Sequence, residues 1–347
     1  MSFRNLSPQV MFGKMAAEHK PTFAFTGKTK KDFGAWKKKA WPEVLATLGN
    51  WPQKVPLNPM LLSEWEHDGL LKQKWLIDVQ KHMSATFLIN QPKDLKKSEK
   101  RAAIFCCHGH GPYGKEPVMG NNSTPALRAT IQDHNYNYGH QMAKKGFVTY
   151  AIDFIGFGER NDSNKPQHWP GEREWCNCLY LHTTMLGMTS LSINLAHGQA
   201  ATDFACTFKT VDAQRLGVMG LSGGGTMSLW TGLCDPRIKA TEVICYSDLW
   251  EHMGIRDINY CGMQVAPGLY QRVDIPDLQG LLAPRPLLVD IGAYDECFKI
   301  DSAQACYNKV KKIFAAAGVL DKLELDLFSG THAWGGHKSE AFFNKHL

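Results

Sequence analysis

The sequence predicts an α/β fold whose core is a doubly wound, mostly parallel sheet with antiparallel first strands and helices on both faces. From residue 101 onward, short apolar runs such as 102–107, 147–153 and 216–220 alternate with helical segments. Continuous apolar strands are typical of a sheet covered on both faces, and strand–helix alternation indicates parallel pairing. Before residue 101, polar and apolar residues alternate over 72–79 and 83–90, which predicts two antiparallel strands.

The chain has 347 residues, enough for one large domain with an appended segment. Residues 1–57 are expected to form an extended arm and one helix, capped by Asp32, that packs on the main domain. Residues 58–347 are expected to form the main domain. Irregular loop insertions at about 161–182 and 249–283 enlarge it.

Composition excludes several classes of protein. Hydrophobic residues make up 44% and charged residues 21% of the chain, as in ordinary globular proteins. No apolar run approaches the roughly 20 residues that cross a bilayer, and residues 1–15 lack the apolar core of a secretory signal. A cytoplasmic protein with no membrane partner is therefore expected. Lys and Arg exceed Asp and Glu by 39 − 33 = 6, in clusters too short to predict a nucleic-acid partner.

The ten cysteines lie mostly in apolar stretches without paired CxxC spacing, so they are interpreted as small buried residues. Cys176 and Cys178 form a local pair, but zinc ligands ordinarily come with a second pair or with histidines at fixed offsets. We therefore predict no metal site and no cofactor.

The motif with the most chemical content is Gly220-Leu221-Ser222-Gly223-Gly224. An apolar strand ends at Gly220, and helix-compatible residues begin directly after Ser222. A serine at such a corner exposes its hydroxyl above the sheet, and glycines are needed because side chains would clash in the turn. A serine hydroxyl requires a general base, which a carboxylate normally orients. Ser222 is therefore the predicted nucleophile.

The acid and the histidine should follow the serine along the chain in this type of fold. Asp295 comes just after an apolar strand and His332 just after the last strand, so both are expected at the C-terminal edge of the sheet. Asp248, after the preceding strand, and Glu296 remain alternative acids. His337, where the last helix begins, is the alternative base.

Acyl transfer also needs backbone N–H donors for the oxyanion that develops on the attacked carbonyl. One is predicted at Gly223 and the other at His110, in the loop after the strand at 102–107. The imidazole of His108 in that loop is interpreted as a brace beside the substrate pocket, and it is also a candidate pocket residue. Two histidines so close could ligate a metal, but nothing else in the sequence completes such a site.

These motifs together resemble a known family. The segments HGHGPYGKE, DFIGFGER, GLSGGG, LLAPRPLLVDIGAYDECF and GTHAW follow one another within residues 100–346. In this order they are similar to the α/β-hydrolase superfamily, and most of all to its acetyl xylan esterase-like and dienelactone hydrolase-related branch. The resemblance implies an α/β-hydrolase catalytic domain and a serine esterase with Ser222, Asp295 and His332 as triad. Dienelactone hydrolases proper use a cysteine nucleophile, and the first 100 residues match no motif of this branch.

Four further residues are candidates for the substrate pocket. Glu159 and Arg160 lie near the expected mouth of the site, where they either brace the loop as an ion pair or contact the substrate. Trp169 and Trp250 lie in the two insertions, where aromatic residues either stack on a sugar ring or pack the loop itself.

The predicted function is hydrolysis of a carboxylic ester through an acyl-enzyme on Ser222, with a small-molecule or carbohydrate ester as partner. Hydrolysis of lactones or acyl peptides by the same triad is one alternative, and a non-catalytic ligand-binding protein of hydrolase fold is another. The sequence leaves open the acyl and alcohol groups and the oligomeric state.

Overall fold

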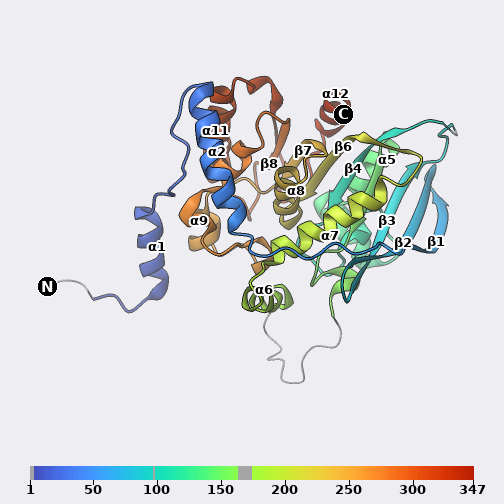
Figure 1. Cartoon of the computed structure of the whole chain (residues 1–347), viewed down its shortest axis with the longest axis horizontal. Coiled ribbons are helices and arrows are strands. Elements are labelled where there is room, and N and C mark those ends of the chain that lie inside the picture. The colour runs from blue at the N-terminus through green and yellow to red at the C-terminus, as the bar shows by residue number, and fades with distance from the viewer. Residues whose placement is uncertain (1–3, 97, 163–173) are drawn as a thin grey trace.

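In residues 4–96, 98–162 and 174–347, the parts of the chain that the computed structural model describes, nine strands form one sheet (Figure 1). Their order across the sheet is β1-β2-β3-β5-β4-β6-β7-β8-β9. β4 to β9 pair in parallel, whereas β1, β2 and β3 pair antiparallel with their neighbours. The strands are β1 (Met60–His67), β2 (Leu70–Gln80), β3 (Met83–Pro92), β4 (Arg101–Cys107), β5 (Val148–Ile152), β6 (Val211–Leu221), β7 (Ile238–Ile244), β8 (Leu287–Gly292) and β9 (Leu323–Phe328).

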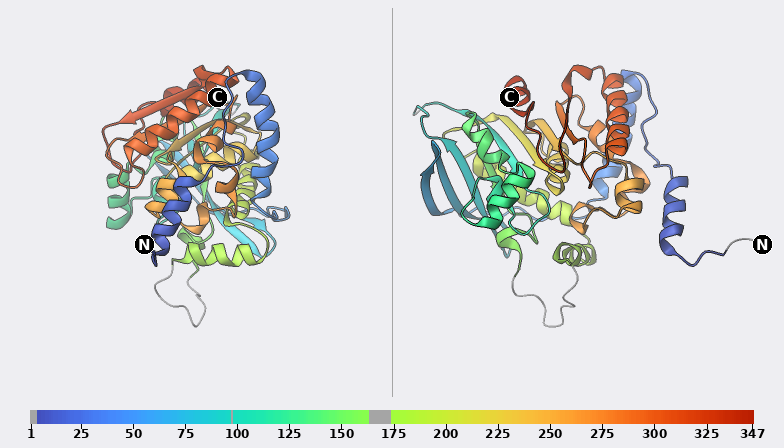
Figure 2. Two further views of the ribbon diagram at one scale, coloured as in Figure 1. Left: turned by 90° about the vertical axis from the view of Figure 1, so that its left-hand side faces the viewer. Right: turned by 180° about the vertical axis from the view of Figure 1, so that it is seen from behind.

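The central strands are apolar along their length because helices cover both faces of the sheet. Every residue of β5 and β8 is buried. On the face toward the viewer in Figure 1 lie α7 (Ser190–Ala205) and α8 (Gly223–Cys234). α5 (Tyr138–Lys144) covers the opposite face, seen in the right-hand view of Figure 2, and α12 (Ser339–His346) lies beside its C-terminal end. The predicted doubly wound sheet with antiparallel first strands is confirmed.

None of the helices in the described part of the chain is long and apolar enough to cross a bilayer.

The remaining helical elements lie around this core. The remaining α-helices are α1 (Pro8–Glu18), α2 (Lys30–Ala46), α3 (Lys115–Val118), α4 (Pro125–His134), α6 (Trp175–Met185), α9 (Leu269–Arg272), α10 (Ile275–Leu281) and α11 (Ile300–Ala317). Short 3-10 turns form η1 (Gly158–Arg160), η3 (Gly262–Gln264) and η4 (Leu320–Lys322), and a π-helix forms η2 (Trp250–Arg256).

The N-terminal segment differs from the expected extended arm and Asp32 cap. It contains helix α1, which has Ser7 as its N-cap and Pro8 as its first residue, a combination that favours a helix start. The cap of α2 is Thr29, whose hydroxyl accepts the N–H of Asp32, while the Asp32 carboxylate accepts the N–H of Thr29. Asp32 is thus the third helical residue of a capping box. α2 lies beside α11 (Figure 1).

The structure also holds elements that the sequence pattern did not indicate. β1 is an edge strand whose eight residues are all exposed, so no buried face marks it in the sequence. The insertion expected at 161–182 contains most of α6, and the one at 249–283 contains η2, η3, α9 and α10, so neither is wholly irregular. α10 begins at Asp274-Ile275-Pro276, where aspartate caps the helix and proline occupies the first turn.

The ten cysteines are all free, seven of them buried and three half-buried. None is bridged to another, so packing rather than cross-linking holds the sheet and its helices together. This agrees with their interpretation as small apolar residues.

Acidic side chains lie buried where β7, β8 and β9 run side by side. Glu242, Asp290 and Asp326 are each at most 4% exposed. The indole N–H of Trp334 and the hydroxyl of Ser339 donate to Glu242 at 3.2 and 2.7 Å. Burial, reinforced by the nearby Asp326 carboxylate, raises the pKa of Glu242 above the ordinary glutamate value. At pH values above the ordinary glutamate pKa of 4.5, the folded chain therefore keeps this proton more readily than the unfolded chain does.

We expect the contribution of Glu242 to the free energy of unfolding to fall as pH rises above 4.5, the ordinary pKa of glutamate, so that the pH slope of this free energy is more negative in the unmodified protein than in Glu242→Gln. Because the pKa of Glu242 is higher in the folded chain, the folded state binds more protons in this window and loses stability with rising pH. Urea titrations at a series of pH values measure the slope. Glu66→Gln on the exposed edge strand is the control, and an unchanged slope in Glu242→Gln would contradict the assignment.

Candidate active site

Ser222 occupies the corner between β6 and α8 in a backbone conformation that non-glycine residues rarely adopt, with φ 61° and ψ −121°. The corner is tight because three backbone segments meet there. A Cβ on Gly220 would lie 2.3 Å from the carbonyl oxygen of Gly224, and one on Gly224 would lie 2.1 Å from that of Cys107. Only glycine fits at these two positions, so the motif forces the Ser222 side chain away from the sheet and toward its C-terminal edge.

His332 and Asp295 meet at the same edge. Asp295 follows β8, His332 follows β9, and His332 Nδ1 lies 2.9 Å from Asp295 Oδ2. The other carboxylate oxygen accepts the N–H groups of Cys297 and Phe298 at 2.7 and 3.0 Å, and the Phe298 ring stacks on the imidazole. These contacts fix the carboxylate and leave His332 Nε2 as the free ring nitrogen.

Burial alone would raise the pKa of Asp295. The hydrogen bond and charge of His332, together with the N–H of Phe298, instead hold it below the ordinary aspartate value. A carboxylate that stays ionised can orient a neighbouring imidazole and stabilise its protonated form.

The alternative acids and base lie elsewhere. Asp248 is buried and accepts the hydroxyl of Ser302, and burial raises its pKa to about 7. Glu296 is exposed. His337 pairs with Asp326 at 3.2 Å. Of these candidates, Asp295 is the carboxylate that the structure places on His332.

The predicted oxyanion donors lie next to each other. A Cβ placed on Gly223 would be 3.3 Å from the backbone nitrogen of His110, so the loop after β4 lies directly against the start of α8. Gly109 N–H donates to the hydroxyl of Tyr136 at 2.5 Å, which fixes this loop from the other side. Two backbone N–H groups placed so close can stabilise one developing oxyanion.

Ser222 and His332 line one cavity of about 170 Å³. In the part of the chain that the structure describes, the lining contains no Lys, Arg, Asp or Glu. The lining residues are Gly109, His110, Gly111, Pro112, Tyr113, Gly114, Pro117, Thr130, His134, Tyr136, Leu221, Ser222 and His332.

Two of the predicted pocket residues lie outside this cavity. His108 is fully buried and braces the loop, because its Nδ1 contacts the carbonyl of Gly109 and its Nε2 accepts the N–H of Phe154 at 2.9 Å. Trp250 is buried in η2 and packs edge-on against Tyr260. Trp169 lies outside the described residues.

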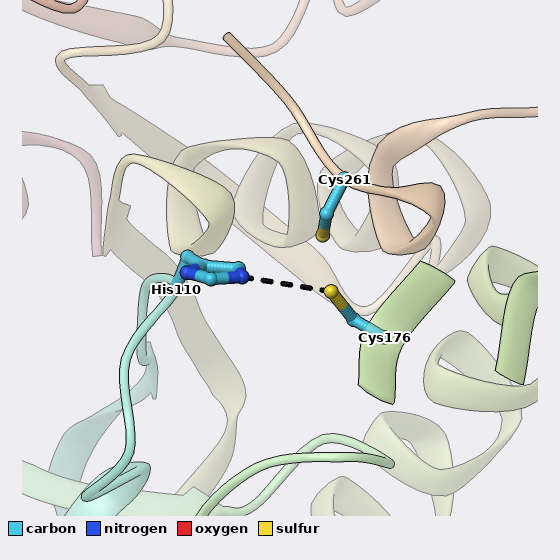
Figure 3. Close-up of side chains that lie close together, drawn as sticks. All are labelled: His110, Cys176 and Cys261. Carbon is cyan, nitrogen blue, oxygen red and sulfur yellow. Dashed lines mark hydrogen bonds between the residues drawn. The ribbon is translucent and has the colours of Figure 1, made fainter. Parts of the chain in front are cut away.

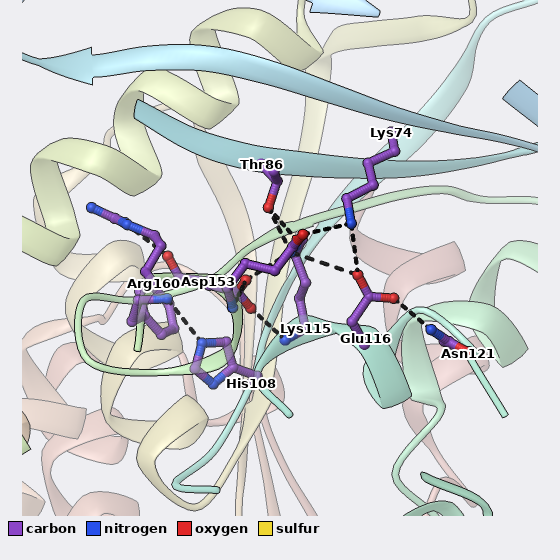
Figure 4. Close-up of polar contacts among 10 residues, drawn as sticks. Lys74, Thr86, His108, Lys115, Glu116, Asn121, Asp153 and Arg160 are labelled. Carbon is purple, nitrogen blue, oxygen red and sulfur yellow. Dashed lines mark hydrogen bonds and ion pairs between the residues drawn. The ribbon is translucent and has the colours of Figure 1, made fainter. Parts of the chain in front are cut away.

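Glu159 and Arg160 also lie outside the cavity and belong to a polar network behind the loop after β4 (Figure 4). Its centre is Lys115, which has no exposed side-chain surface and lies 2.7 Å from both Asp153 and Glu159. Burial would raise the pKa of Glu159, but the charge of Lys115 and hydrogen bonds from Lys115 and Lys74 lower it to about 2. Arg160 donates to the carbonyl of Asp153 at 2.8 Å. Glu159 and Arg160 therefore hold this loop in place and do not line the cavity.

Sequence reasoning missed several residues around the site. His134 and Tyr136, which line the cavity, belong to α4 and the turn after it, and no motif marks them. Cys245 lies beside Asp295 and His332, with one donor atom of each of the three within 4.8 Å of the others, because it follows β7 next to β8. A second group of donor atoms belongs to His110, which lines the cavity, and to Cys176 and Cys261. Spacing along the chain could reveal none of these, since each contact joins distant segments.

Fold and site together define a class of protein. An α/β-hydrolase has this arrangement: a strained serine after β6, an aspartate after β8 and a histidine after β9. The sequence matches the model of the Abhydrolase family over residues 2–313, and the chain belongs to that family. The resemblance stated from the motifs is confirmed.

Known relatives agree with this assignment. The Bacillus subtilis protein named "Putative hydrolase YtaP" is 22% identical over 80% of this chain and 88% of its own. A Bacteroides fragilis structure titled "putative acetyl xylan esterase" superposes with TM-score 0.75 at 22% identity, over 94% of this chain and 82% of its own. A glucuronoyl esterase from Solibacter usitatus superposes with TM-score 0.63 at 16% identity, over 90% and 92%. At these identities the two structures show the shared fold.

Lys115→Met is expected to lower the free energy of unfolding by about 3–5 kcal/mol, because it leaves the fully buried Asp153 without its ionic partner. Lys93→Met is the matched control: Lys93 and Glu66 form a pair with both side chains at least half exposed, and its loss should cost less than about 1 kcal/mol. Chemical denaturation of both variants measures the difference. Equal losses would show that the network contributes no more than a surface pair.

Proposed function

We propose that this protein hydrolyses carboxylic esters through an acyl-enzyme on Ser222. The observation that supports this most is the shared cavity, which is lined by Ser222 of the strained corner and by His332, the histidine that Asp295 orients. If the glycine-rich turn at Ser222 served only to reverse the backbone, nothing would require it to share a cavity with an imidazole that a carboxylate orients.

In the proposed mechanism His332 Nε2 takes the proton of Ser222 as the hydroxyl oxygen attacks the ester carbonyl. Asp295 holds Nδ1 of the same ring and stabilises the imidazolium. The N–H groups of Gly223 and His110 bind the oxyanion of the tetrahedral intermediate. The alcohol leaves with the proton from His332, and water, activated by the same imidazole, then releases the acid from Ser222.

The cavity supports a small, neutral ester as the substrate. Pockets that enclose a drug-sized ligand have volumes of about 300–1,000 Å³, well above the 170 Å³ found here. This space suits an acetyl or other short acyl group, with the alcohol part reaching toward solvent. The uncharged lining favours an acyl group without a charge, and the esterase names among the structural neighbours agree with ester chemistry. An acetylated carbohydrate or a simple short-chain ester fits this description.

Ser222→Ala should lower kcat for 4-nitrophenyl acetate by at least about 10³-fold while the protein stays folded, because the covalent route is lost. Labelling by a fluorophosphonate probe should disappear in the same variant. Ser63→Ala, on the exposed edge strand β1, is the control and should behave as the unmodified protein. Retained activity and labelling in Ser222→Ala would refute the assignment of the nucleophile.

The acyl group can be tested separately. With 4-nitrophenyl esters of increasing acyl length, kcat/KM should fall by at least about tenfold between acetate and octanoate, because the cavity cannot enclose the longer chain. Steady-state assays on the two esters measure this ratio. A constant or rising kcat/KM would contradict a short-acyl site and leave the nucleophile assignment untouched.

A further inference from the structure

Three side chains from distant segments lie close together (Figure 3), and one of them, His110, lines the cavity. They are His110 of the loop after β4, Cys176 of α6, and Cys261 directly before η3. One donor atom of each, the histidine nitrogen and the two sulfur atoms, lies within 4.8 Å of the other two. In Figure 3 the imidazole points at Cys176, and the sulfur of Cys261 lies over the same space.

A fourth donor lies close to two of these three. The Glu174 carboxylate lies 3.8 Å from His110 Nε2 and 3.7 Å from Cys176 Sγ. The cluster thus offers one nitrogen, two sulfurs and one oxygen, all of them atom types that Zn²⁺ accepts in tetrahedral sites.

The two separations that involve the Cys176 sulfur match the geometry of a tetrahedral zinc ion. With Zn–S near 2.3 Å and Zn–N near 2.05 Å, tetrahedral angles place a nitrogen and a sulfur ligand about 3.6 Å apart. His110 Nε2 and Cys176 Sγ are 3.5 Å apart. An oxygen ligand at about 2.1 Å would lie about 3.6 Å from a sulfur, close to the 3.7 Å between Glu174 and Cys176.

The surroundings hold the two sulfurs in place. Both cysteines are buried, Cys176 at 4% and Cys261 at 3% exposure. The sulfur of Cys261 accepts the backbone N–H of Gln264, a contact that favours a thiolate. The N–H of Gly262 donates to the side chain of Asn177 on α6 at 2.7 Å. These contacts supply the outer support that metal ligands generally have.

A glycine lets the two cysteine segments come together. A Cβ on Gly262 would lie 2.2 Å from the Cβ of Tyr180, so a side chain at 262 would push η3 away from α6. Gly262 directly follows Cys261, so the close approach of Gly262 to α6 also brings the Cys261 sulfur near that of Cys176.

We propose that this protein binds one Zn²⁺ through His110 Nε2, the sulfurs of Cys176 and Cys261, and the carboxylate of Glu174. Binding releases the protons of the two thiols, since both sulfurs ligate as thiolates. All four positions are filled by protein atoms, which is typical of a structural rather than a catalytic zinc. His110 and Glu174 are partly exposed, with 43% and 58% of their side chains accessible, so the ion can reach the site from solvent.

The zinc would also hold the proposed oxyanion loop. The backbone N–H of His110 is one proposed oxyanion donor, and its side chain would be tied through the metal to α6 and η3. This consequence for activity rests on the proposed function, whereas zinc binding itself does not.

The test uses the full-length chain without an affinity tag, purified under reducing conditions and stripped of metal. Zinc content after incubation with one equivalent of Zn²⁺ and dialysis should be close to one ion per chain. Cys176→Ser and Cys261→Ser should each weaken zinc binding by more than about 100-fold in competition with a chromogenic chelator. Cys178→Ser is the matched control, because this buried cysteine lies on the same helix outside the cluster.

Cobalt gives a readout that does not depend on activity or on overall stability. Co²⁺ in the site should produce a thiolate-to-cobalt charge-transfer band in the unmodified protein and in Cys178→Ser, weakened in each of the other two variants. Failure of the reduced protein to take up zinc, or equal uptake by all four proteins, would overturn the proposal. A Cys176–Cys261 disulfide that forms when the metal-free protein is exposed to air, together with no zinc uptake by the reduced protein, would overturn it in favour of a redox pair.

Discussion

The close approach of three backbone segments beneath Ser222 is the constraint on which the site depends. The end of β4, the end of β6 and the start of α8 are so near one another that Gly220 and Gly224 have no room for a Cβ. This contact fixes the sharp turn and holds Ser222 at positive φ. It also sets the position of the β4 loop relative to the helix, and hence the distance between the N–H groups of His110 and Gly223. Nucleophile and proposed oxyanion donors are therefore placed by one packing constraint.

The parallel sheet brings the remaining groups to the same edge. β6, β8 and β9 all end there, so residues that follow them, Ser222, Asp295 and His332, share one region although they lie far apart in the chain. Behind the β4 loop, the buried pair of Lys115 and Asp153 supports the side that faces away from the cavity. A loop braced in this way loses little conformational entropy when it binds an oxyanion.

The cluster of His110, Cys176 and Cys261 adds a third support to this loop. The polar network holds the loop from behind, Tyr136 holds Gly109, and the cluster includes the side chain of His110, which lines the cavity. Through α6 and η3 it would join two insertions to the loop that carries His110. The shape of the cavity would then depend on segments that differ most freely in sequence between related folds.

The sequence by itself determined the sheet and its parallel core, and it predicted Ser222 and His332 at one edge of that sheet, because apolar periodicity and the order of motifs along the chain record which segments are buried and which residues follow strands. It did not reveal β1, whose exposed residues carry no burial pattern, nor the helices α1 and α6 within segments expected to be irregular.

Only the tertiary structure decided the rest. It separated Asp295 from Asp248, because both follow strands in the sequence and their distances to His332 alone distinguish them. It moved Glu159 and Arg160 from the pocket to a brace, since which face of a loop meets the cavity is set by packing. It brought Cys261 to Cys176 and His110. Spacing along the chain can encode a metal site only when its ligands are neighbours in sequence, and here the sheet and its insertions bring them together.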